Sequence, residues 1–510
     1  MNRPRIIVIL AAAALGFALL AAKLGEIQIV MGKMLAESAY RQRTVEIPVG
    51  PERGRILDRY GRDLTDSTVA VASLDLASFR VSDVLTDPEQ VRLRASSSSL
   101  LVPKIIRYGE NSLARHLVGY INLVDNSGVS GIEKVFDSLL APDGSHRKLV
   151  VSADARGYVI PGLGYSVVEG KSCSDLVLTI DKDIQQIVEE VMDSRIQAGA
   201  VVVMDPWTGE VLALASRPEF DQNDVLPYLD AAGSPMLNRA LIGFYPGSLF
   251  KVVVATAALE EGLLHEGSQF LCTGSIEVQG LRFGCYKPDG HGVISLSHAM
   301  AYSCNPVFIE IGQIIGAEQL MKYCQAFGLG ERTYMGLPGE TSGNLPRHEQ
   351  IVPRMLANIS IGQDPLTVTP VQMAQVISAL ANGGMLIRAR VVEEARQGNK
   401  LVQKMPIPAS ERIMSEGTAA TVRSMLSGVT RFGTGTAAYM HGQGAGKTGT
   451  AETGVVSADG NRLTYSWFAG FFPVGAPRYV MVVLDEQGMS GSVSAAPVFA
   501  EIAERILSIR

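Results

Sequence analysis

The sequence predicts an α/β fold in which one sheet is assembled from strands that lie far apart in the chain. Residues 198–216 read as two apolar strands around the turn DPWTG at 205–209, which is a strong hairpin signal. Helical patterns dominate residues 248–384, and strands return at 464–474 and 478–486. Strands at both ends of a region with helices between them indicate a sheet flanked by helices, with a helical subdomain.

The N-terminus carries an uncharged run that is long enough to cross a membrane. Arg3 and Arg5 precede the run at 6–22, and Lys23 closes it. A helix of this length is at the lower limit for a membrane span. A cleaved secretory signal is the alternative, and both readings export the remaining chain. Because no A-x-A site precedes a polar start, we expect residues 1–24 to be a cytoplasmic tip and a single-pass anchor, with the rest extracytoplasmic.

The next segments predict two further units. Residues 45–67 alternate like strands, are interrupted by prolines and glycines, and carry four arginines. Their simplest interpretation is a solvated segment held by Arg–Asp pairs. A new unit begins near Asp175, where the strand LVLTI precedes a helix capped by Asp181. We therefore expect one domain at 25–170 and a second domain at 171–510.

Composition excludes several classes of function. The formal net charge is −6 and there are no long Lys/Arg blocks, which argues against nucleic acid as a partner. Five cysteines are too few and odd in number for a disulfide scaffold. Cys272 and Cys285 are equally consistent with a disulfide and with two thiols. A zinc site from these two with His265 and His291 lacks a C-x-x-C element, so we expect no metal.

Ser248 and Lys251 form the first candidate catalytic pair. They stand at the start of an apolar helical run that ends near Gly262. Residues three apart share a helix face, so the hydroxyl and the amine are neighbours. Burial disfavours the charged ammonium and frees its lone pair, which suits a nucleophile and its base. The alternative is a cap serine followed by a lysine that extends to solvent.

Two further motifs bear on this pair. Ser303 and Asn305 lie two residues apart, and the alternative interpretation is that Asn305 caps a helix with Pro306 in its first position. Lys447 opens the sequence KTGT, residues 447–450. A phosphate-binding loop requires glycine at 441, where His441 stands, and it must open a helix, which this turn-and-strand pattern does not. The motif therefore does not predict nucleotide binding.

Taken together, S-x-x-K, S-x-N and K-T-G in this order resemble the penicillin-binding proteins, and specifically their class B transpeptidases. The resemblance covers nearly the whole chain. Further matching segments are RGRILDRYGRDL, VGYIN, SGVSGIEKVFD, LTIDKDIQ, VVVMDPWTGEVLALASRPEFD, SIGQDPLTVTPVQMAQVISALANGG and SWFAGFFP. The resemblance implies the penicillin-binding transpeptidase fold at 171–510, with an elongated pedestal domain at 25–170.

The resemblance also implies roles for individual residues. Ser248 would attack the carbonyl of a D-alanyl-D-alanine stem peptide, and Lys251 would be the general base. Ser303 would relay a proton to the leaving D-alanine, and Asn305 would bind Lys251 and the substrate amide. Lys447 would supply positive potential for the substrate carboxylate, which the hydroxyl groups of Thr448 and Thr450 would also bind. Gly449 suits a strand that the substrate backbone approaches closely.

The same resemblance implies that backbone N–H groups of Ser248 and Thr450 form the oxyanion hole. It implies no cofactor. Cys304, between the two polar residues of the second motif, is most simply a small apolar filler with no catalytic role.

The resemblance implies partners and excludes relatives with other activities. It implies acylation by β-lactam antibiotics, a SEDS-type glycan polymerase as membrane partner, and a role in division, elongation or sporulation of a bacterium. Hydrolases of this group, including β-lactamases, usually lack the RGRILDRYG segment, and a β-lactam sensor needs further spans or a cytoplasmic effector. A bifunctional enzyme needs a glycosyltransferase domain where this chain matches the pedestal. The remaining alternatives are a D,D-carboxypeptidase and a non-catalytic scaffold.

Overall fold

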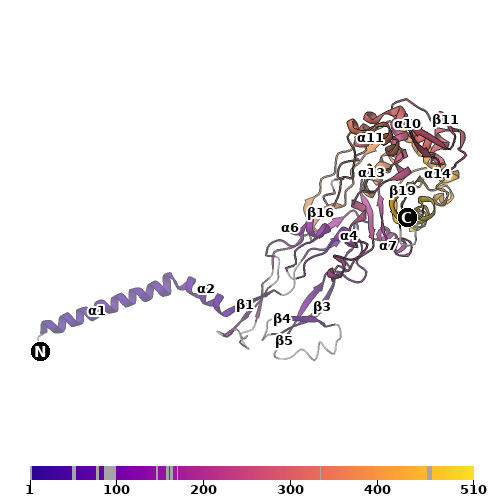
Figure 1. The fold of residues 1–510 in the computed structure, drawn as a ribbon. Coiled ribbons are helices and arrows are strands. Elements are labelled where there is room, and N and C mark those ends of the chain that lie inside the picture. Colours follow the sequence, from indigo (N-terminus) through magenta and orange to yellow (C-terminus); the bar gives the residue numbers. More distant parts are fainter. Residues whose placement is uncertain are drawn as a thin grey trace. The chain divides into compact units, whose positions relative to one another are not determined.

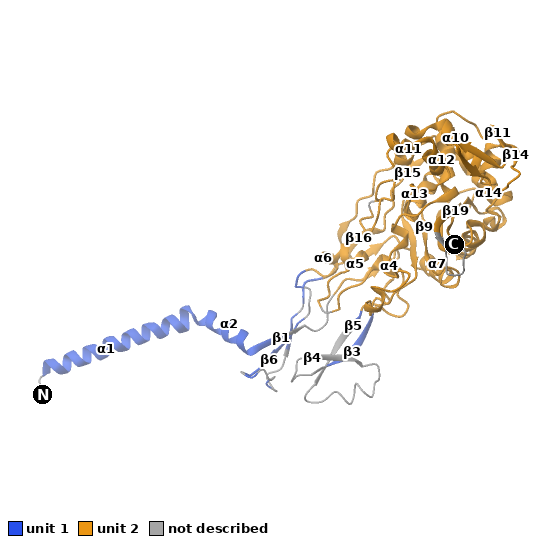
Figure 2. Ribbon diagram, in the orientation of Figure 1, with its two compact units in different colours: residues 1–52, 68–106, 143–172 blue, residues 53–67, 107–142, 173–510 orange. Residues whose placement is uncertain are grey.

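The structure is a computed structural model that describes residues 3–48, 53–75, 80–85, 99–123, 125–144, 148–154, 156, 160, 165–168, 170–333, 335–456 and 462–509. These residues form two compact units, which Figure 2 colours separately. Unit 1 contains residues 1–52, 68–106 and 143–172, and unit 2 contains residues 53–67, 107–142 and 173–510. Two segments of the expected domain at 25–170 therefore cluster with the C-terminal region rather than with their sequence neighbours.

Unit 1 begins with an apolar helix and continues into two small sheets (Figure 1). The stretch Arg3–Val30 contains an 18-residue window with a mean hydropathy of 2.4 and is long enough to cross a membrane, in agreement with the predicted apolar span. The sheets have the strand orders β1-β6-β7 and β4-β3-β5. The elements of unit 1 are α1 (Arg3–Gly25), the π-helix η1 (Glu26–Val30), α2 (Gly32–Arg43), β1 (Thr44–Pro48), β3 (Thr68–Asp75), β4 (Arg80–Leu85), β5 (Ser99–Ile106), β6 (Lys148–Ser152) and β7 (Tyr165–Val168).

Unit 2 is built on a five-stranded sheet of order β10-β9-β21-β20-β19, in which all neighbours are antiparallel. This confirms the prediction that strands far apart in sequence share one sheet. The strands are β9 (Gly199–Met204), β10 (Val211–Arg217), β19 (Ala445–Val456), β20 (Arg462–Phe472) and β21 (Tyr479–Gly488). The first two form the predicted hairpin.

Helices cover both faces of this sheet. Val202 of β9 belongs to one buried cluster with residues of α8 (Lys251–Glu260) and α13 (Pro370–Ala381). Its neighbours Val201 and Val203 belong to a second cluster with α7 (Lys182–Arg195) and α15 (Ala496–Ile509). Because successive side chains of a strand point to opposite faces, these runs are apolar throughout rather than alternating.

The remaining elements of unit 2 include a helical subdomain and several short sheets. A four-stranded sheet has the order β17-β16-β8-β2. The elements are β2 (Ile56–Leu57), α4 (Arg115–Val118), α5 (Gly131–Val135), α6 (Asp137–Leu140), β8 (Asp175–Leu178), η2 (Leu226–Tyr228), η3 (Arg239–Leu241), η4 (Gly247–Phe250), β11 (Gln269–Cys272), β12 (Ser275–Val278), β13 (Leu281–Gly284), β14 (Gly292–Ser295), α9 (Leu296–Ala301), α10 (Asn305–Ile315), α11 (Ala317–Ala326), η5 (His348–Gln350), α12 (Pro353–Ser360), β15 (Met385–Leu386), β16 (Val392–Gln397), β17 (Lys400–Lys404), β18 (Glu411–Arg412), α14 (Glu416–Phe432), η6 (Thr436–Ala438), η7 (Met440–Gly442) and η8 (Gly491–Ala495).

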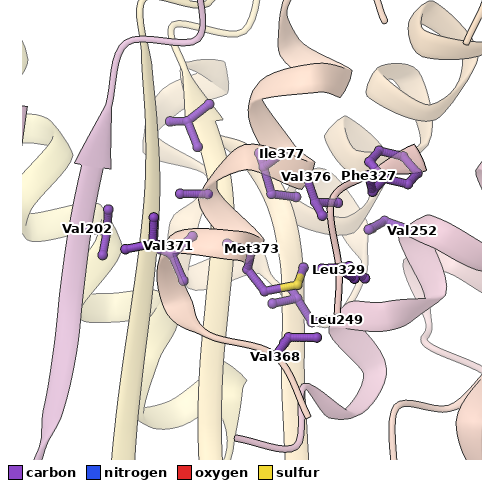
Figure 3. Packing of buried hydrophobic residues seen from close by; sticks show 14 of the residues in the cluster. Val202, Leu249, Val252, Phe327, Leu329, Val368, Val371, Met373, Val376 and Ile377 are labelled. Carbon is purple, nitrogen blue, oxygen red and sulfur yellow. The ribbon is translucent and has the colours of Figure 1, made fainter. Parts of the chain in front are cut away.

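The core of unit 2 fixes the turn that carries the first candidate pair. Leu249 and Val252, the residues after Ser248 and Lys251, are fully buried. Figure 3 shows both side chains in the cluster that also holds Met373 of α13. Burying such side chains stabilises the fold by about 1.5–3 kcal/mol each, so packing sets the position of the polar residues beside them.

A buried ion-pair network joins the arginine-rich segment to the rest of unit 2. Arg53 Nε lies 2.5 Å from Glu133 Oε2, and Arg107 Nε lies 2.8 Å from Glu133 Oε1. Arg53 also donates to the Asp137 carboxylate at 2.7 Å, and the Tyr108 hydroxyl donates to Glu133. The expected Arg–Asp pairing of this segment is therefore present, with a glutamate as its central acid. The expectation that the segment is solvated was wrong in part, because Arg53, Asp58 and Leu64 are buried.

We expect Glu133→Gln to destabilise unit 2 by about 3–5 kcal/mol, because it leaves Arg53 and Arg107 buried without their shared counter-ion. Urea unfolding of the purified protein measures the change. The control is Glu501→Gln, which breaks a solvent-exposed pair with Arg195 and should cost less than about 1 kcal/mol. Equal small losses for both variants would contradict the prediction.

Candidate active site

Ser248 lies in a tight turn at the start of a buried helix. The 3₁₀ turn η4 contains the serine, and α8 begins at Lys251. The helix ends near Gly262, whose φ of +67° matches the predicted C-terminus. Ser248 is half-buried, whereas Lys251 is completely buried, so the pair combines an accessible hydroxyl with an amine inside the core.

Glycines bring strand β19 against this turn. Gly247 has a φ of +55°, and a Cβ atom there would lie 2.5 Å from the carbonyl oxygen of Thr450. A Cβ atom at Gly449 would lie 2.6 Å from the carbonyl oxygen of Pro246. The expected close approach at Gly449 is therefore made by the chain's own backbone, which places the K-T-G strand beside Ser248.

We expect Gly449→Ala to cost roughly 1–3 kcal/mol in stability and to reduce the reactivity of Ser248, because the added methyl group pushes β19 away from the turn. Thermal unfolding and covalent labelling of Ser248 measure the two effects. Gly475→Ala is the matched control, because a Cβ atom there meets nothing within 4 Å. An alanine at 449 that behaves like the control would contradict the predicted contact.

Lys251 is held by the second motif. Its Nζ donates to the Ser303 carbonyl oxygen at 2.7 Å and to Asn305 Oδ1 at 2.6 Å, and it lies 3.2 Å from Ser303 Oγ. A neutral amine has two N–H bonds and one lone pair. The two short hydrogen bonds use both N–H bonds, which leaves the lone pair for a proton from a nucleophile.

Burial lowers the pKa of Lys251 to about 7. Burial, followed by the nearby charge of Lys251, also lowers the pKa of Lys447 well below its ordinary value. Both shifts have the same sign because burial, the first cause in each case, disfavours the charged ammonium. At neutral pH a large fraction of Lys251 is therefore the free amine that a general base requires.

Lys447 completes the cluster from strand β19. Its Nζ donates to Ser303 Oγ and to the Thr448 carbonyl oxygen, both at 3.0 Å. Ser303 Oγ thus lies between the two lysine nitrogens. Thr448 Oγ1 is 2.7 Å from Thr434 Oγ1, and Thr434 had no sequence signal of its own.

The second motif differs in one detail from the expected helix cap. Cys304, not Asn305, is the N-cap residue of α10, and Asn305 and Pro306 are its first two residues. The expectation that Asn305 caps this helix was therefore wrong by one position. The physical reason is that the Asn305 amide oxygen accepts from Lys251 instead.

A cavity of about 1010 Å³ opens onto these groups. Of the predicted site residues, its lining includes Ser248, Ser303, Asn305, Thr448 and Thr450. The two lysines and Gly449 are not in its lining and lie buried behind the cavity-facing residues. The structure therefore brings all eight predicted residues to one place, five on the cavity surface and three beneath it. Lining residues that the motifs did not indicate include Asn358, Gln363, Asp364, Ser490 and Ser492.

Comparison with known proteins identifies the family. Residues 199–504 match the family described as the penicillin binding protein transpeptidase domain. The chain is 30% identical to the stage V sporulation protein D of Bacillus subtilis, over 98% of this chain and 85% of that protein. It is 29% identical to the peptidoglycan D,D-transpeptidase FtsI of Escherichia coli K12, over 78% of this chain and 66% of that protein.

Solved structures agree with this assignment. Penicillin-binding protein 3 of Mycobacterium tuberculosis, crystallised in complex with aztreonam, has a TM-score of 0.70 and 29% identity, covering 91% of this chain and 97% of that one. A chain of a peptidoglycan synthase complex that couples polymerization and crosslinking has a TM-score of 0.75, with 99% of each chain covered; at 24% identity it shows the fold. The chain belongs to the penicillin-binding protein transpeptidase family, and within that family to the class B proteins.

Proposed function

We propose that this protein cross-links peptidoglycan stem peptides through an acyl-enzyme on Ser248, as a class B D,D-transpeptidase. The observation that carries the proposal is the contact of Lys251 Nζ with Ser303 and Asn305 behind a cavity that Ser248 lines. A buried amine with both N–H bonds satisfied and a pKa of about 7 is equipped to accept a proton from a neighbouring hydroxyl.

In the acylation step, Ser248 Oγ attacks the carbonyl carbon of the penultimate D-alanine, and its proton passes to Lys251. The Oγ–C bond forms, the amide C–N bond breaks, and the leaving D-alanine nitrogen receives a proton through Ser303. The amine of a second stem peptide then attacks the ester, so that one amide is exchanged for another and Ser248 recovers its proton. This is ping-pong chemistry.

The substrate carboxylate would bind beside strand β19. Thr448 and Thr450 line the cavity, and the Lys447 amine donates to the Thr448 carbonyl oxygen. Without a ligand, burial and Lys251 disfavour the charged form of Lys447. A bound carboxylate supplies the missing counter-charge and would raise the pKa of Lys447, so substrate binding and protonation of this lysine reinforce each other.

Backbone N–H groups of Ser248 and Thr450 are proposed to bind the oxyanion of the tetrahedral intermediate. Gly247 and Gly449 hold the backbones of the two segments in contact, which keeps these donors near one another. Each such donor contributes about 2.7–4 kcal/mol to the stability of the transition state.

Fluorescent penicillin tests the proposal on the full chain in detergent. We expect one covalent adduct per chain, mapped by mass spectrometry to the peptide that contains Ser248, because a β-lactam resembles the D-alanyl-D-alanine terminus. Labelling at another residue, or no labelling by a folded protein, would favour the non-catalytic scaffold. Release of D-alanine that does not depend on an acceptor amine would favour a D,D-carboxypeptidase.

The proposal extends to location and partner. We propose that residues 1–24 anchor the chain once in the bacterial cytoplasmic membrane with unit 2 outside, and that residues 25–170 serve as the pedestal for the transpeptidase domain at 171–510. The apolar helix of unit 1 supports the anchor, and the synthase-complex chain of like fold supports a SEDS-type glycan polymerase as partner. Affinity purification of this protein from membranes should recover such a polymerase. A variant in which an unrelated membrane span replaces residues 1–43 should not recover it. Equal recovery by both proteins would overturn the proposal that residues 1–43 bind the polymerase.

A further inference from the structure

We propose that Cys272, Cys285, His291 and Cys304 bind one zinc ion in a closed Cys₃His site. The three sulfur atoms and one imidazole nitrogen lie within 4.8 Å of one another. Zinc takes four such ligands tetrahedrally when its role is structural. The set differs from the one that the sequence suggested, because Cys304 replaces His265, and the expectation that no metal binds gives way to this proposal.

Two antiparallel strand pairs and the start of α10 bring the four residues together. Strands β11 and β14 pair so that Cys272 is opposite Gly292, which places His291 beside Cys272. Cys285 follows strand β13, and its N–H donates to the Gly274 carbonyl oxygen at 2.8 Å. Cys304 arrives from the N-terminus of α10. The residues span 33 positions of sequence, and no pair has C-x-x-C spacing.

Two glycines make the loops around the cluster compact. Gly274 has a φ of +95°, and a Cβ atom there would lie 1.8 Å from the Pro288 carbonyl oxygen. A Cβ atom at Gly290 would lie 2.1 Å from the Cys272 carbonyl oxygen. These contacts hold the segment that carries Cys272 against the loop that leads to His291.

The distances suit a zinc ion. Cys285 Sγ lies 3.5 Å from His291 Nδ1. Tetrahedral zinc with bonds of about 2.3 Å to sulfur and about 2.05 Å to nitrogen separates these atoms by about 3.6 Å, and two sulfurs by about 3.8 Å. Because all four atoms lie within 4.8 Å of one another, no pair has to close by more than about 1.2 Å to reach these separations.

The groups around the ligands are those that support a metal centre. His291 Nε2 lies 3.2 Å from the Tyr286 hydroxyl, so the ring nitrogen that faces the sulfurs is Nδ1. The ring also stacks on Tyr302, with centroids 5.8 Å apart and planes at 14°. A hydrogen-bond partner on the second ring nitrogen, here the Tyr286 hydroxyl, orients a metal-binding histidine.

Backbone N–H donors lie beside each sulfur, where they support a metal-bound thiolate. The donors are the N–H groups of Gly274 and His291 for Cys272, of Lys287 for Cys285, and of Val307 for Cys304. The backbone of all three cysteine segments is thus already folded around the sulfur atoms.

The donor set favours zinc over a disulfide. One disulfide would use two of the three sulfurs and leave the third sulfur and the imidazole without a role. The three cluster cysteines are thiols in the structure and form no disulfide. Three soft sulfurs and one imidazole, with no carboxylate among the four, select zinc over the hard cations magnesium and calcium. Four protein ligands leave no open position, so the ion would be structural.

The site would position the second catalytic motif. Cys304 lies between Ser303 and Asn305, and both of these hold Lys251. Ser303 has a φ of +56°, a left-handed conformation that L-residues other than glycine rarely adopt. A metal bond at the next residue would fix this turn and with it the acceptors for the Lys251 amine. This consequence rests on the proposed function, whereas zinc binding does not.

The direct test is the metal content of the full chain, purified in detergent with reductant and without a polyhistidine tag. We expect about one zinc ion per chain by mass spectrometry. Cys272→Ser should lose most of it, and Cys324→Ala should keep it, because Cys324 is a buried cysteine outside the cluster. If Cys272→Ser does not fold, the wild-type protein refolded with cobalt should show thiolate-to-cobalt charge transfer and tetrahedral d–d bands.

A second variant tests the support of His291. Tyr286→Phe removes the hydroxyl that holds Nε2 and keeps the ring, and we expect zinc affinity to fall roughly 10–100-fold in chelator competition. Removal of zinc should slow acylation by penicillin about 10²-fold, because the Lys251 acceptors move, and added zinc should restore the rate. Unchanged acylation on reversible zinc removal would overturn the positioning role.

Other outcomes overturn the site itself. The first is purified protein that contains no zinc and in which all five thiols react with a thiol reagent. The second is a mass spectrum that shows a disulfide among the three cluster cysteines. The third is a cobalt-refolded protein whose spectrum lacks thiolate-to-cobalt charge transfer. Zinc retained in a protein that penicillin never acylates would instead sink the proposed function and leave the metal site intact.

Discussion

Ser248→Ala is expected to abolish acylation by penicillin and transfer between stem peptides, with a loss on the order of 10⁶-fold, as for removal of a serine nucleophile in other acyl-transfer enzymes. The hydroxyl oxygen is the atom that forms the ester, so no other group in the cavity replaces it. Stopped-flow or gel-based labelling with fluorescent penicillin measures the acylation rate, and release of D-alanine measures turnover.

The fold of this variant should be intact. The Ser248 hydroxyl makes no hydrogen bond to the residues that the structure describes, and the turn is held by Leu249 and by the glycine contacts with β19. The melting temperature should therefore stay close to that of the wild type. Ser508→Ala, at an exposed serine of the last helix, is the control and should label at the wild-type rate. A covalent adduct that persists in Ser248→Ala would refute the assignment of the nucleophile.

Much of the active site could be predicted because its chemistry depends on short spacings. Ser248 and Lys251 are one helical turn apart, and Ser303 and Asn305 are two residues apart, so each pair is visible in a window of four residues. The order of the three motifs then indicated a single site. The structure adds the arrangement, in which Ser303 Oγ lies between Nζ of Lys251 and Nζ of Lys447.

Features that depend on tertiary contacts were not visible in the sequence. Cys304 was interpreted as an apolar filler, which agrees with its full burial, and nothing near it in sequence indicates the three neighbours that two antiparallel strand pairs bring to it. His265 was included in the considered set because it is close in sequence, although it lies outside the cluster. We expected Gly449 to allow close approach of the substrate backbone. In the structure, the group that lies closest to the position of a Cβ atom at Gly449 is the Pro246 carbonyl oxygen.

The division into units shows the same limit. The strand and capped helix that begin near Asp175 suggested one boundary between two continuous ranges. In the structure, Arg53 and Arg107 share the carboxylate of Glu133, and their segments cluster with the sheet that follows residue 173. A buried ion pair between residues 80 positions apart leaves no local signal beyond an unusual number of arginines.

Lys251→Met is expected to slow acylation by about 10²–10⁴-fold, the usual contribution of a general base. Methionine keeps most of the buried volume, so the loss reports the amine rather than a cavity. It also leaves the Ser303 carbonyl and Asn305 Oδ1 without their donor, which removes the link between the first and second motifs. Lys134→Met, at an exposed lysine in unit 2, is the matched control and should leave the rate unchanged.

The pH dependence of acylation provides the sharper test, because its sign follows from burial. The pKa of Lys251 is lowered to about 7 by burial, and only the neutral amine accepts the proton of Ser248. The second-order rate constant should therefore rise about tenfold per pH unit below about 7 and level off above it. Lys251→Met should lose this rising limb together with the rate. A wild-type profile that is flat across this range, or that falls as pH rises, would mean that another group takes the proton, and the buried amine would then serve only to hold Ser303 and Asn305 in place.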